Sequence, residues 1–357
     1  MRVRNFNAGP GAIPLEVLQK ARDEFLDFNG NGCSIIELSH RSKAFDEVIN
    51  SVKMRVKRLY SLTDEFEILF LQGGASLQFA QIPMNMTNGG VAQYVDTGAW
   101  TKKAIKEAEI LGIKHEVIAS SKEDGYSYIP KFKFSDDADY GYICSNNTIY
   151  GTQYRELPKT KCPLIVDSSS DLFSRPIDFG NIGLFYGGIQ KNGGPSGVVL
   201  VIIRKELAEQ RDKSNLPTML RYMPQIQANS MVNTPNTFGI YMLGLTLEWI
   251  EKFGGLKEIE RYNDKKSKLL YKSIDEMSEF YIGHARADSR SKMNVVFNLA
   301  NKELEAKFIE ESLKNNMIGL KGHRSVGGIR ASIYNAVTYE DVEALTSFMS
   351  DFAKKNG

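Results

Sequence analysis

Residues 164–203 contain three nearly continuous apolar runs: LIVD at 164–167, IGLFYGGI at 182–189 and VVLVII at 198–203. Short apolar runs of this kind, bounded by turn residues, are typical of strands that are buried on both faces. Asp167 closes the first run, and Lys191 follows the second between two glycine pairs. This stretch therefore predicts a buried sheet that presents an acid and a lysine at the ends of its strands.

The chain before this stretch alternates between strands and helices. Four further strands are predicted at 66–71, 91–95, 116–118 and 140–144, and helices are predicted at 45–60, 75–84 and 100–111. This alternation predicts an α/β fold in which a mostly parallel, seven-stranded sheet is flanked by helices. In such sheets ligands bind beyond the carboxyl ends of the strands.

The remainder of the chain indicates a second, smaller unit. A long helix is predicted from about 238 to Gly254-Gly255, and a charged helix at 258–277. At the start of the chain, residues 14–28 are also predicted to form a helix. Beyond these, strands are predicted at 294–298 and 329–334, helices at 303–315 and from about 339, and a loop at 319–328. Since 357 residues exceed one ordinary core, we expect a large domain (15–258), a small α+β domain (259–357) and an N-terminal segment (1–14) joining them.

Composition excludes several classes of partner. The formal net charge is only +2, so nothing global favours nucleic acid or a membrane surface, and no stretch approaches 18 uninterrupted apolar residues. Cys33, Cys144 and Cys162 are odd in number and widely spaced, with no zinc-binding pattern. We therefore expect no metal, a reducing compartment and a cytoplasmic location.

Lys191 is the first residue with a chemical interpretation. Alone it could be a solvated turn lysine, but the apolar runs on both sides place it at the edge of a core. Burial lowers the pKa of an amine and makes it a nucleophile toward an aldehyde. The flanking glycines would let a flat ring approach the backbone closely.

Asp167 is the second residue with a chemical interpretation. A carboxylate that ends a buried strand is costly unless it is paired. It could cap a loop, or it could partner a protonated pyridine nitrogen and keep that ring an electron sink. An acid some two dozen residues before a lysine, each closing a strand, favours the second interpretation.

Two weaker signals accompany this pair. Gly73-Gly74-Ala75-Ser76 lies between a strand and a helix, where free N–H groups and the helix dipole favour an anion, and Ser76 adds a hydroxyl. The motif is neither GxGxxG nor a P-loop, which disfavours dinucleotides and nucleoside triphosphates. Trp100 follows a strand end and could stack on a ring or simply belong to the core.

Two basic clusters suggest a substrate with two or more negative charges. His40-Arg41 forms one cluster, and the glycine-rich segment 321–330 places His323, Arg324 and Arg330 in the other. Both could be solvated surface loops. Arginine forks, however, match carboxylate and phosphate, and a glycine-rich loop can wrap such groups.

At this point the sequence resembles the phosphoserine aminotransferases, which are class V aminotransferases with the type I fold of pyridoxal 5'-phosphate (PLP) enzymes. The resemblance covers essentially the whole chain. It rests on the segments Asn5–Pro10, Ser39–Ser42, Gln72–Ser76, Gly98–Trp100, Asn146–Gly151, Ser174–Pro176, Gln190–Asn192, Asn233–Pro235 and Gly322–Asn335. The last of these is highly specific to the family.

The resemblance implies a role for each site residue. Lys191 would form the Schiff base with PLP, Asp167 would pair with the pyridine nitrogen, Trp100 would stack on the ring and Thr148 would contact it. The cofactor phosphate would be held by Ala75, Ser76 and Gln190, with Asn233 and Thr234 of the partner subunit in a homodimer with shared sites. The substrate's phosphate or distal carboxylate would meet His323 and Arg324 together with the partner's His40 and Arg41, and Arg330 would take the α-carboxylate.

The implied reaction transfers an amino group from L-glutamate to 3-phosphohydroxypyruvate, giving O-phospho-L-serine and 2-oxoglutarate in serine biosynthesis. The resemblance also permits a role in pyridoxine biosynthesis, where 3-hydroxy-2-oxo-4-phosphooxybutanoate becomes 4-phosphohydroxy-L-threonine. Two positions depart from some family members: Ser76 stands where they carry arginine, and Ala8 where they carry serine. With Ser76 in place of arginine, the cofactor phosphate would have to be held by neutral hydrogen-bond donors and the helix dipole. With Ala8 in place of serine, a substrate contact at that position is in doubt.

Two rival interpretations stay open on the sequence alone. A cysteine desulfurase-like lyase of the same fold would need a reactive cysteine, and Cys33 lies in a loop rich in glycine and asparagine. Cys144 and Cys162 look structural. A catalytically silent binding module of the same fold is the other rival, and the intact Asp167 and Lys191 disfavour it.

Overall fold

The computed structural model describes residues 2–324 and 326–357. Its centre is a seven-stranded sheet with the strand order β2-β10-β9-β8-β5-β3-β4, in which only β10 runs antiparallel to its neighbours. The strands are β2 (Phe66–Leu71), β3 (Ala92–Asp96), β4 (His115–Ser120), β5 (Tyr140–Cys144), β8 (Leu164–Asp167), β9 (Ile182–Gly188) and β10 (Val199–Arg204). The predicted mostly parallel, seven-stranded sheet is therefore confirmed.

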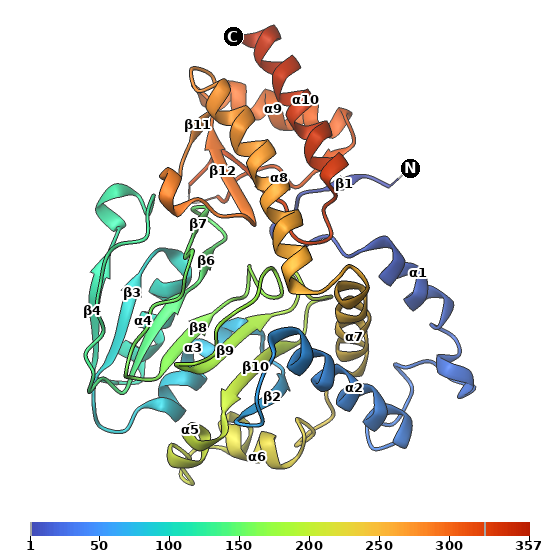
Figure 1. The fold of residues 1–357 in the computed structure, drawn as a ribbon, viewed down its shortest axis with the longest axis vertical. Helices are drawn as coiled ribbons and strands as arrows, with labels where there is room; N and C mark the ends of the chain where they lie inside the picture. The colour runs from blue at the N-terminus through green and yellow to red at the C-terminus, as the bar shows by residue number, and fades with distance from the viewer. Residues whose placement is uncertain (1, 325) are drawn as a thin grey trace.

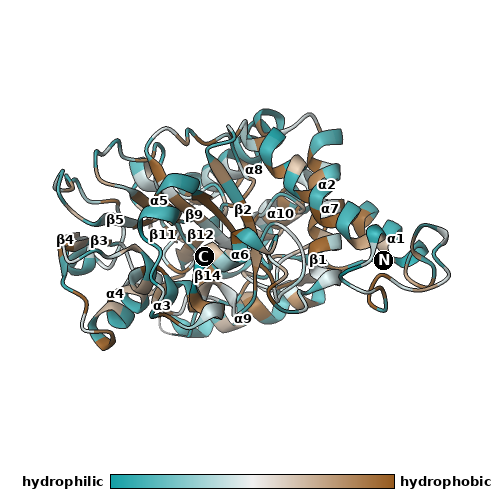
Figure 2. Cartoon of the chain, turned by 90° about the horizontal axis from the view of Figure 1, so that it is seen from below, coloured by the Kyte–Doolittle hydropathy of each residue, from teal (hydrophilic) through white to brown (hydrophobic). Residues whose placement is uncertain are grey.

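Helices cover both faces of this sheet because successive strand residues point to opposite sides. On β8, Leu164 and Val166 join the apolar cluster on one face, and Ile165 joins the cluster on the other. One face is covered by α1 (Leu15–Asp23), α2 (Lys43–Tyr60) and α7 (Thr237–Lys252). The other is covered by α3 (Gly74–Met86), α4 (Ala99–Ile110), α5 (Lys205–Gln210) and α6 (Tyr222–Gln227). The central strands are largely brown in Figure 2, whereas the surrounding helices carry teal outer faces.

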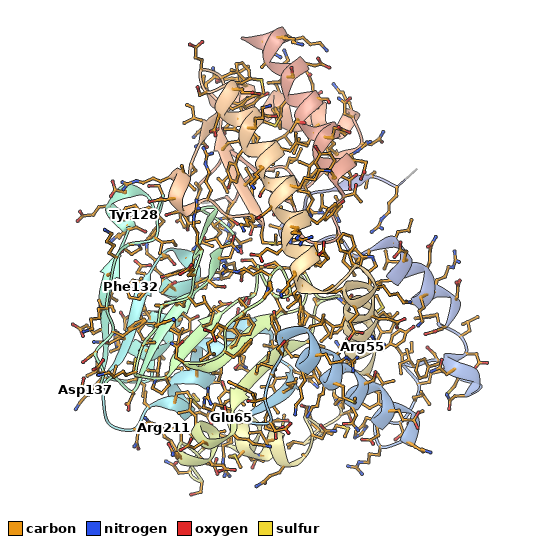
Figure 3. The ribbon with its side chains drawn as sticks, viewed as in Figure 1. Arg55, Glu65, Tyr128, Phe132, Asp137 and Arg211 are labelled. Atoms are coloured by element: carbon orange, nitrogen blue, oxygen red, sulfur yellow. The ribbon has the colours of Figure 1, made fainter. Side chains whose placement is uncertain are left out.

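Local signals explain several of these helices. Helix α2 begins where the Ser42 hydroxyl accepts a hydrogen bond from the Phe45 N–H, which is a standard N-cap. It packs against α7, and Arg55 links the two helices through ion pairs with Glu248 and Glu251 (Figure 3). The helix predicted at 14–28 was wrong in its end, because α1 stops at Asp23. The chain then turns so that Phe28 can pack edge-on against Tyr241.

A second, smaller unit follows the sheet in sequence (Figure 1). It contains the antiparallel sheet β11-β12-β14 and three helices around its own apolar cluster. Its elements are α8 (Leu256–Glu276), β11 (Ile282–Gly283), β12 (Asn294–Asn298), α9 (Lys302–Lys314), β13 (Met317–Ile318), β14 (Ile329–Ser332) and α10 (Tyr339–Asn356). Strand β1 (Arg4–Asn5) pairs with β13, which ties the N-terminal segment to this unit. The division into domains 15–258 and 259–357 stays a prediction.

The remaining elements are short. They are β6 (Asn146–Asn147), β7 (Thr152–Gln153), η1 (Phe28–Gly30), η2 (Lys122–Asp124), η3 (Thr218–Leu220) and η4 (Ala287–Ser289). Strands β6 and β7 form a hairpin directly after β5. Thr148 lies in the turn of this hairpin. Within the described part of the chain, every helix is too short or too polar to span a bilayer.

Candidate active site

The carboxyl ends of the parallel strands bring the predicted residues together. Asp167 is the last residue of β8, Lys191 lies three residues beyond β9, and Trp100 lies in the first turn of α4 after β3. These side chains line one cavity of about 130 Å³. The other residues around it are Gly74, Ala75, Ser76, Phe79, Cys144, Asn146, Thr148, Ser169, Ser170 and Gln190. The edge of the sheet that was predicted to bind a ligand therefore has a pocket.

Asp167 is held as a buried acceptor at one end of this cavity. Its side chain is only 3% exposed, and its Oδ1 accepts hydrogen bonds from the Ser169 N–H at 2.9 Å and the Ser169 hydroxyl at 2.6 Å. Burial raises the pKa of the Asp167 carboxyl, while the bonds from Ser169 act in the opposite direction. The Tyr186 hydroxyl also hydrogen-bonds to this carboxyl and, like Ser169, favours its charged form.

Lys191 reaches into the same cavity. Its Nζ donates to Thr148 Oγ1 at 2.7 Å and lies 5.1 Å from the centre of the Trp100 ring. Burial lowers the pKa of Lys191, and Asp167 opposes that shift. A lowered pKa increases the fraction of neutral, nucleophilic amine at physiological pH.

The N-terminal segment packs on the backbone of Lys191, which the sequence did not reveal. The Gly11 N–H donates to the Gln190 carbonyl at 2.8 Å, and a Cβ built on Gly9 would lie 3.2 Å from Lys191 Cγ. A Cβ on Gly11 would come within 2.5 Å of the Lys191 carbonyl oxygen, so only glycine fits there. The one available signal was the Gly9-Pro10-Gly11 turn itself, whose partner could not be known.

The first turn of α3 offers an anion site next to the lysine. Gly73 precedes the helix with φ of 90°, no side chain caps the helix, and its first turn holds no acid. The first backbone N–H groups of a helix have no intrahelical partner and carry a partial positive charge. Ala75 and Ser76 lie in this turn and line the cavity. A phosphate group is the ligand that such a site favours.

The residues present fit PLP. The cavity supplies an amine for an aldehyde, a buried carboxylate for a ring nitrogen, an indole for the ring face and an uncapped helix for a phosphate. The Trp100 Nε1 is buried with no hydrogen-bond partner among the described residues. A buried N–H of this kind is costly without an acceptor, so its donor is available to a bound group.

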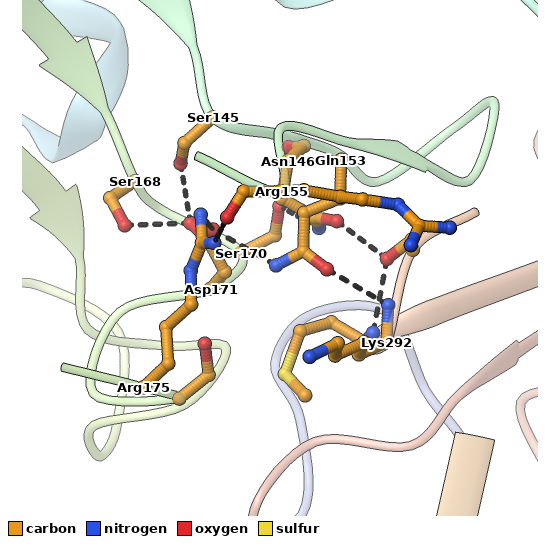
Figure 4. A network of polar contacts seen from close by, with 12 residues as sticks. Ser145, Asn146, Gln153, Arg155, Ser168, Ser170, Asp171, Arg175 and Lys292 are labelled. Atoms are coloured by element: carbon orange, nitrogen blue, oxygen red, sulfur yellow. Dashed lines mark hydrogen bonds and ion pairs between the residues drawn. The ribbon is translucent and has the colours of Figure 1, made fainter. Parts of the chain in front are cut away.

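A second buried acid lies behind Asp167, and sequence reasoning missed it. Asp171 is 2% exposed and forms the centre of a polar network in Figure 4. Its carboxylate accepts from Ser145 Oγ at 2.5 Å, Ser168 Oγ at 2.6 Å and Gln153 Nε2 at 3.1 Å, and it pairs with Arg175 at 3.7 Å. The Ser145 hydroxyl also lies 3.2 Å from the Asp167 carbonyl oxygen. This network therefore fixes the backbone that carries Asp167.

One of the predicted basic residues lies beside the lysine. Arg330 Nη1 donates to the Thr148 carbonyl at 3.4 Å, and its Nε is buried without a hydrogen-bond partner in the described residues. Burial lowers the pKa of His323, and the charges of Arg330 and Arg324 lower it further, so these cations share one region. Arg324 is exposed on the glycine-rich loop, and Ser325 of that motif lies outside the described residues.

Seven predicted residues do not line the cavity of their own chain. They are His323, Arg324 and Arg330, described above, and His40, Arg41, Asn233 and Thr234. His40 and Arg41 precede α2, with Arg41 exposed, and the exposed Asn233 and Thr234 precede α7. Asn233 instead lines a different pocket beneath Gln72 and Gly73. Thr234 lies close to it, since its carbonyl accepts from Gln72 Nε2 at 2.8 Å.

The fold and this site define a class of protein that sequence comparison identifies. A sequence model of the class-V aminotransferases matches residues 3–345, and the chain belongs to that family. The "Phosphoserine aminotransferase" of Campylobacter jejuni subsp. doylei is 54% identical over 356 residues and covers 99% of either chain.

Within this class, solved structures narrow the family to the phosphoserine aminotransferases. The enzyme of that name from Bacillus circulans subsp. alkalophilus superposes with a TM-score of 0.97 at 48% identity, covering 100% of this chain and 99% of that one. A PLP-bound phosphoserine aminotransferase from Trichomonas vaginalis gives 0.93 at 37% identity, covering 98% and 100%. Membership of this family makes the chain a PLP-dependent transaminase and confirms the resemblance found in the sequence.

Proposed function

We propose that this chain transfers the amino group of L-glutamate to 3-phosphohydroxypyruvate, reversibly, and releases O-phospho-L-serine and 2-oxoglutarate. The observation that carries the proposal is the single cavity that joins Lys191, Asp167 and Trp100 to the uncapped start of α3. The full-length relatives named phosphoserine aminotransferase support the choice of substrates. A cysteine desulfurase-like activity through Cys33 loses support, because Cys33 does not line this cavity.

Lys191 would hold PLP covalently through its Nζ. When bound, PLP supplies an electron sink that stabilises negative charge at the α-carbon of the amino acid. When the Lys191 amine is not bound to PLP, it would take the α-proton of glutamate as a general base. In the second half of the reaction it would return a proton to the α-carbon of the product. Its hydrogen bond to Thr148 Oγ1 at 2.7 Å supports a fixed position for that amine.

Asp167 would hold the proton of the pyridine nitrogen. The carboxylate is buried in the cavity lining, and Ser169 fixes its orientation through Oδ1. The ion pair would oppose the burial that raises the pKa of Asp167. Trp100 would cover one ring face, and Ala75, Ser76 and Gln190 would hold the cofactor phosphate with the helix dipole of α3.

Arg330 would bind the α-carboxylate of either substrate. Its position beside Thr148 and its unpartnered Nε support a bidentate contact with a carboxylate. His323 and Arg324 would then meet the phosphate of 3-phosphohydroxypyruvate or the distal carboxylate of glutamate.

We further propose a homodimer with shared sites. His40, Arg41, Asn233 and Thr234 match the family motifs but do not line their own chain's cavity. A partner subunit would bring Asn233 and Thr234 to the cofactor phosphate, and His40 and Arg41 to the substrate.

Three free cysteines support the proposed cytoplasmic location. Use of 3-hydroxy-2-oxo-4-phosphooxybutanoate in pyridoxine biosynthesis stays a prediction.

Replacing Arg324 with alanine is expected to lower kcat/KM for 3-phosphohydroxypyruvate about ten- to a hundredfold. A charge-assisted contact to phosphate contributes about 1.5–3 kcal/mol, and pyruvate lacks that group. Steady-state kinetics with both oxo acids measures the difference. Lys321→Ala, which removes a nearby exposed charge from the same segment, is the control and should leave the ratio of the two substrates nearly unchanged. An equal loss for both oxo acids in Arg324→Ala would contradict a contact to the phosphate.

Mixing a weakened variant with an inactive one tests the shared site. Arg41→Ala is expected to cause a similar loss, and in a heterodimer with Lys191→Ala one site should recover. That site combines the lysine of the Arg41→Ala subunit with the intact Arg41 of its neighbour. Activity is measured before and after exchange of differently tagged subunits, with exchange demonstrated by co-purification. Exchange without any recovery would mean that Arg41 serves its own subunit.

A further inference from the structure

Lys266 is a fully buried lysine that the proposed reaction does not use. It lies on α8, its side chain is 0% exposed, and its Nζ contacts three backbone carbonyls. The acceptors are the oxygens of Ile333 at 3.1 Å, Tyr334 at 2.8 Å and Val337 at 2.8 Å. These carbonyls belong to the segment that leaves β14. The strand predicted at 329–334 therefore ends at Ser332, because the next carbonyls turn to the lysine.

The geometry around Lys266 is that of an ammonium group. A neutral amine has two N–H bonds and a lone pair, so one of three carbonyl oxygens would face that lone pair. A charged lysine in this position costs free energy unless its three donors are all satisfied, as they are here. Burial lowers the pKa of Lys266 to about 7, and Asp341 opposes that shift. The fold therefore keeps a group that is costly to bury, and this group fixes the backbone of residues 333–337.

The segment that Lys266 holds reaches the active-site lysine by two routes. In the first, the Asn335 N–H donates to Asn192 Oδ1 at 2.9 Å, and Asn192 directly follows Lys191. The Asn335 side chain is also fixed, since its Nδ2 donates to the Phe173 carbonyl at 2.8 Å and its Oδ1 accepts from Asn263 at 2.9 Å. Both Asn335 and Asn192 are buried.

The second route passes through the N-terminal segment. The Tyr334 hydroxyl donates to the Ala8 carbonyl at 2.7 Å, and the adjoining Gly9 packs against the Lys191 side chain. The same segment continues β14, which carries Arg330. Any shift of the segment would therefore change the position of Arg330 relative to Lys191.

We propose that Lys266, Asn335 and Asn192, here called the Lys266 network, position the active-site lysine relative to Arg330. The network rests on the proposed function, since it matters for catalysis only if these two residues act on the same substrate. Lys266 is a positioning residue: it touches neither cofactor nor substrate and acts through the backbone of residues 333–337. Catalysis responds strongly to small displacements of reacting groups, so loosening this segment should slow the reaction.

The test uses the PLP-loaded dimer and two independent variants. Lys266→Met keeps the length of the side chain and removes its charge and donors, and Asn192→Ala cuts the first route by removing the Oδ1 that accepts from the backbone N–H of Asn335. Each is measured for kcat, for thermal unfolding, and for the pH midpoint of the visible absorbance of PLP bound to Lys191. The matched control is Lys268→Met, because Lys268 lies on the same helix and is exposed.

Each of the two network variants is expected to lower kcat about ten- to a hundredfold. Each is also expected to move the pH midpoint of the absorbance by about 0.5 pH units or more. Lys268→Met should stay within about twofold of the wild type. The double variant should lose little more than the worse single variant, because both changes break one connection. A merely structural role would lower the unfolding temperature and leave the absorbance midpoint unchanged.

Wild-type kcat and midpoint in a folded Lys266→Met protein would overturn the proposal, and so would fully additive losses in the double variant. If Lys266→Met does not fold, Asn192→Ala and Tyr334→Phe decide, since they cut the two routes separately. Unchanged kcat and midpoint in both variants would overturn the proposal. A wild-type protein without absorbance from PLP on Lys191 would contradict the proposed function, and the network's role in catalysis with it. Failure of the network alone leaves the wild-type band intact.

Discussion

Replacing Lys191 with alanine is expected to lower kcat by about 10³- to 10⁴-fold, which is the upper part of what a positioned general acid–base contributes. The variant loses both the covalent attachment of PLP and the amine that moves the α-proton. It should still bind PLP noncovalently, because Asp167, Trp100 and the first turn of α3 are untouched. Single-turnover kinetics with glutamate measures the rate, and equilibrium dialysis measures the retained PLP.

Borohydride provides the matching chemical test. Reduction should label Lys191 of the wild type and leave the alanine variant unlabelled at that peptide. Lys205→Ala is the control, because Lys205 follows the next buried strand, β10, yet lies far from the cavity lining. Wild-type turnover in Lys191→Ala, or a label on another lysine of the wild type, would contradict the assignment of Lys191.

Replacing Asp167 with asparagine is expected to slow turnover about a hundredfold or more while PLP stays bound. The neutral amide cannot hold the proton of a pyridine nitrogen as an ion pair, so the ring becomes a weaker electron sink. The shape of the side chain is preserved, and its Oδ1 can still accept from Ser169. The measurement is kcat for glutamate and 3-phosphohydroxypyruvate, together with the PLP content of the purified protein.

Asp139 provides a control for the loss of a buried carboxylate. It is 6% exposed and pairs at 3.0 Å with Arg211, which Figure 3 labels. Asp139 directly precedes β5 and so lies at the amino end of that strand, at the edge of the sheet opposite the cavity. Asp139→Asn should lower the unfolding temperature and leave kcat within about twofold. A rate within about twofold of wild type for Asp167→Asn would instead make Asp167 a structural acid.

The residues predicted from sequence are those whose neighbours in the chain explain them. Asp167 and Lys191 follow apolar runs, and the runs alone place both at the carboxyl edge of one sheet. Gly73 and Gly74 between a strand and a helix likewise indicated the anion site. In each case the physics is local, because strand burial and helix termini are set by adjacent residues.

The residues missed by sequence reasoning depend on partners far along the chain. Asp171 follows three serines, and nothing in its local sequence distinguishes it. In the structure, Ser145 and Gln153, which lie much earlier in the chain, donate hydrogen bonds to it. Lys266 belongs to a charged helix and would ordinarily be solvated. Only the return of residues 333–337 onto α8 surrounds it with carbonyls. No periodicity in either segment could have indicated these contacts.

The most direct test of the central claim is the fate of the glutamate nitrogen. The PLP-loaded protein is incubated with ¹⁵N-glutamate and 3-phosphohydroxypyruvate, and the products are identified by mass spectrometry. We predict ¹⁵N in O-phosphoserine and an equal amount of 2-oxoglutarate, with neither product formed by Lys191→Ala. Release of the label as ammonia, or no labelled phosphoserine from the PLP-loaded wild type, would contradict the account.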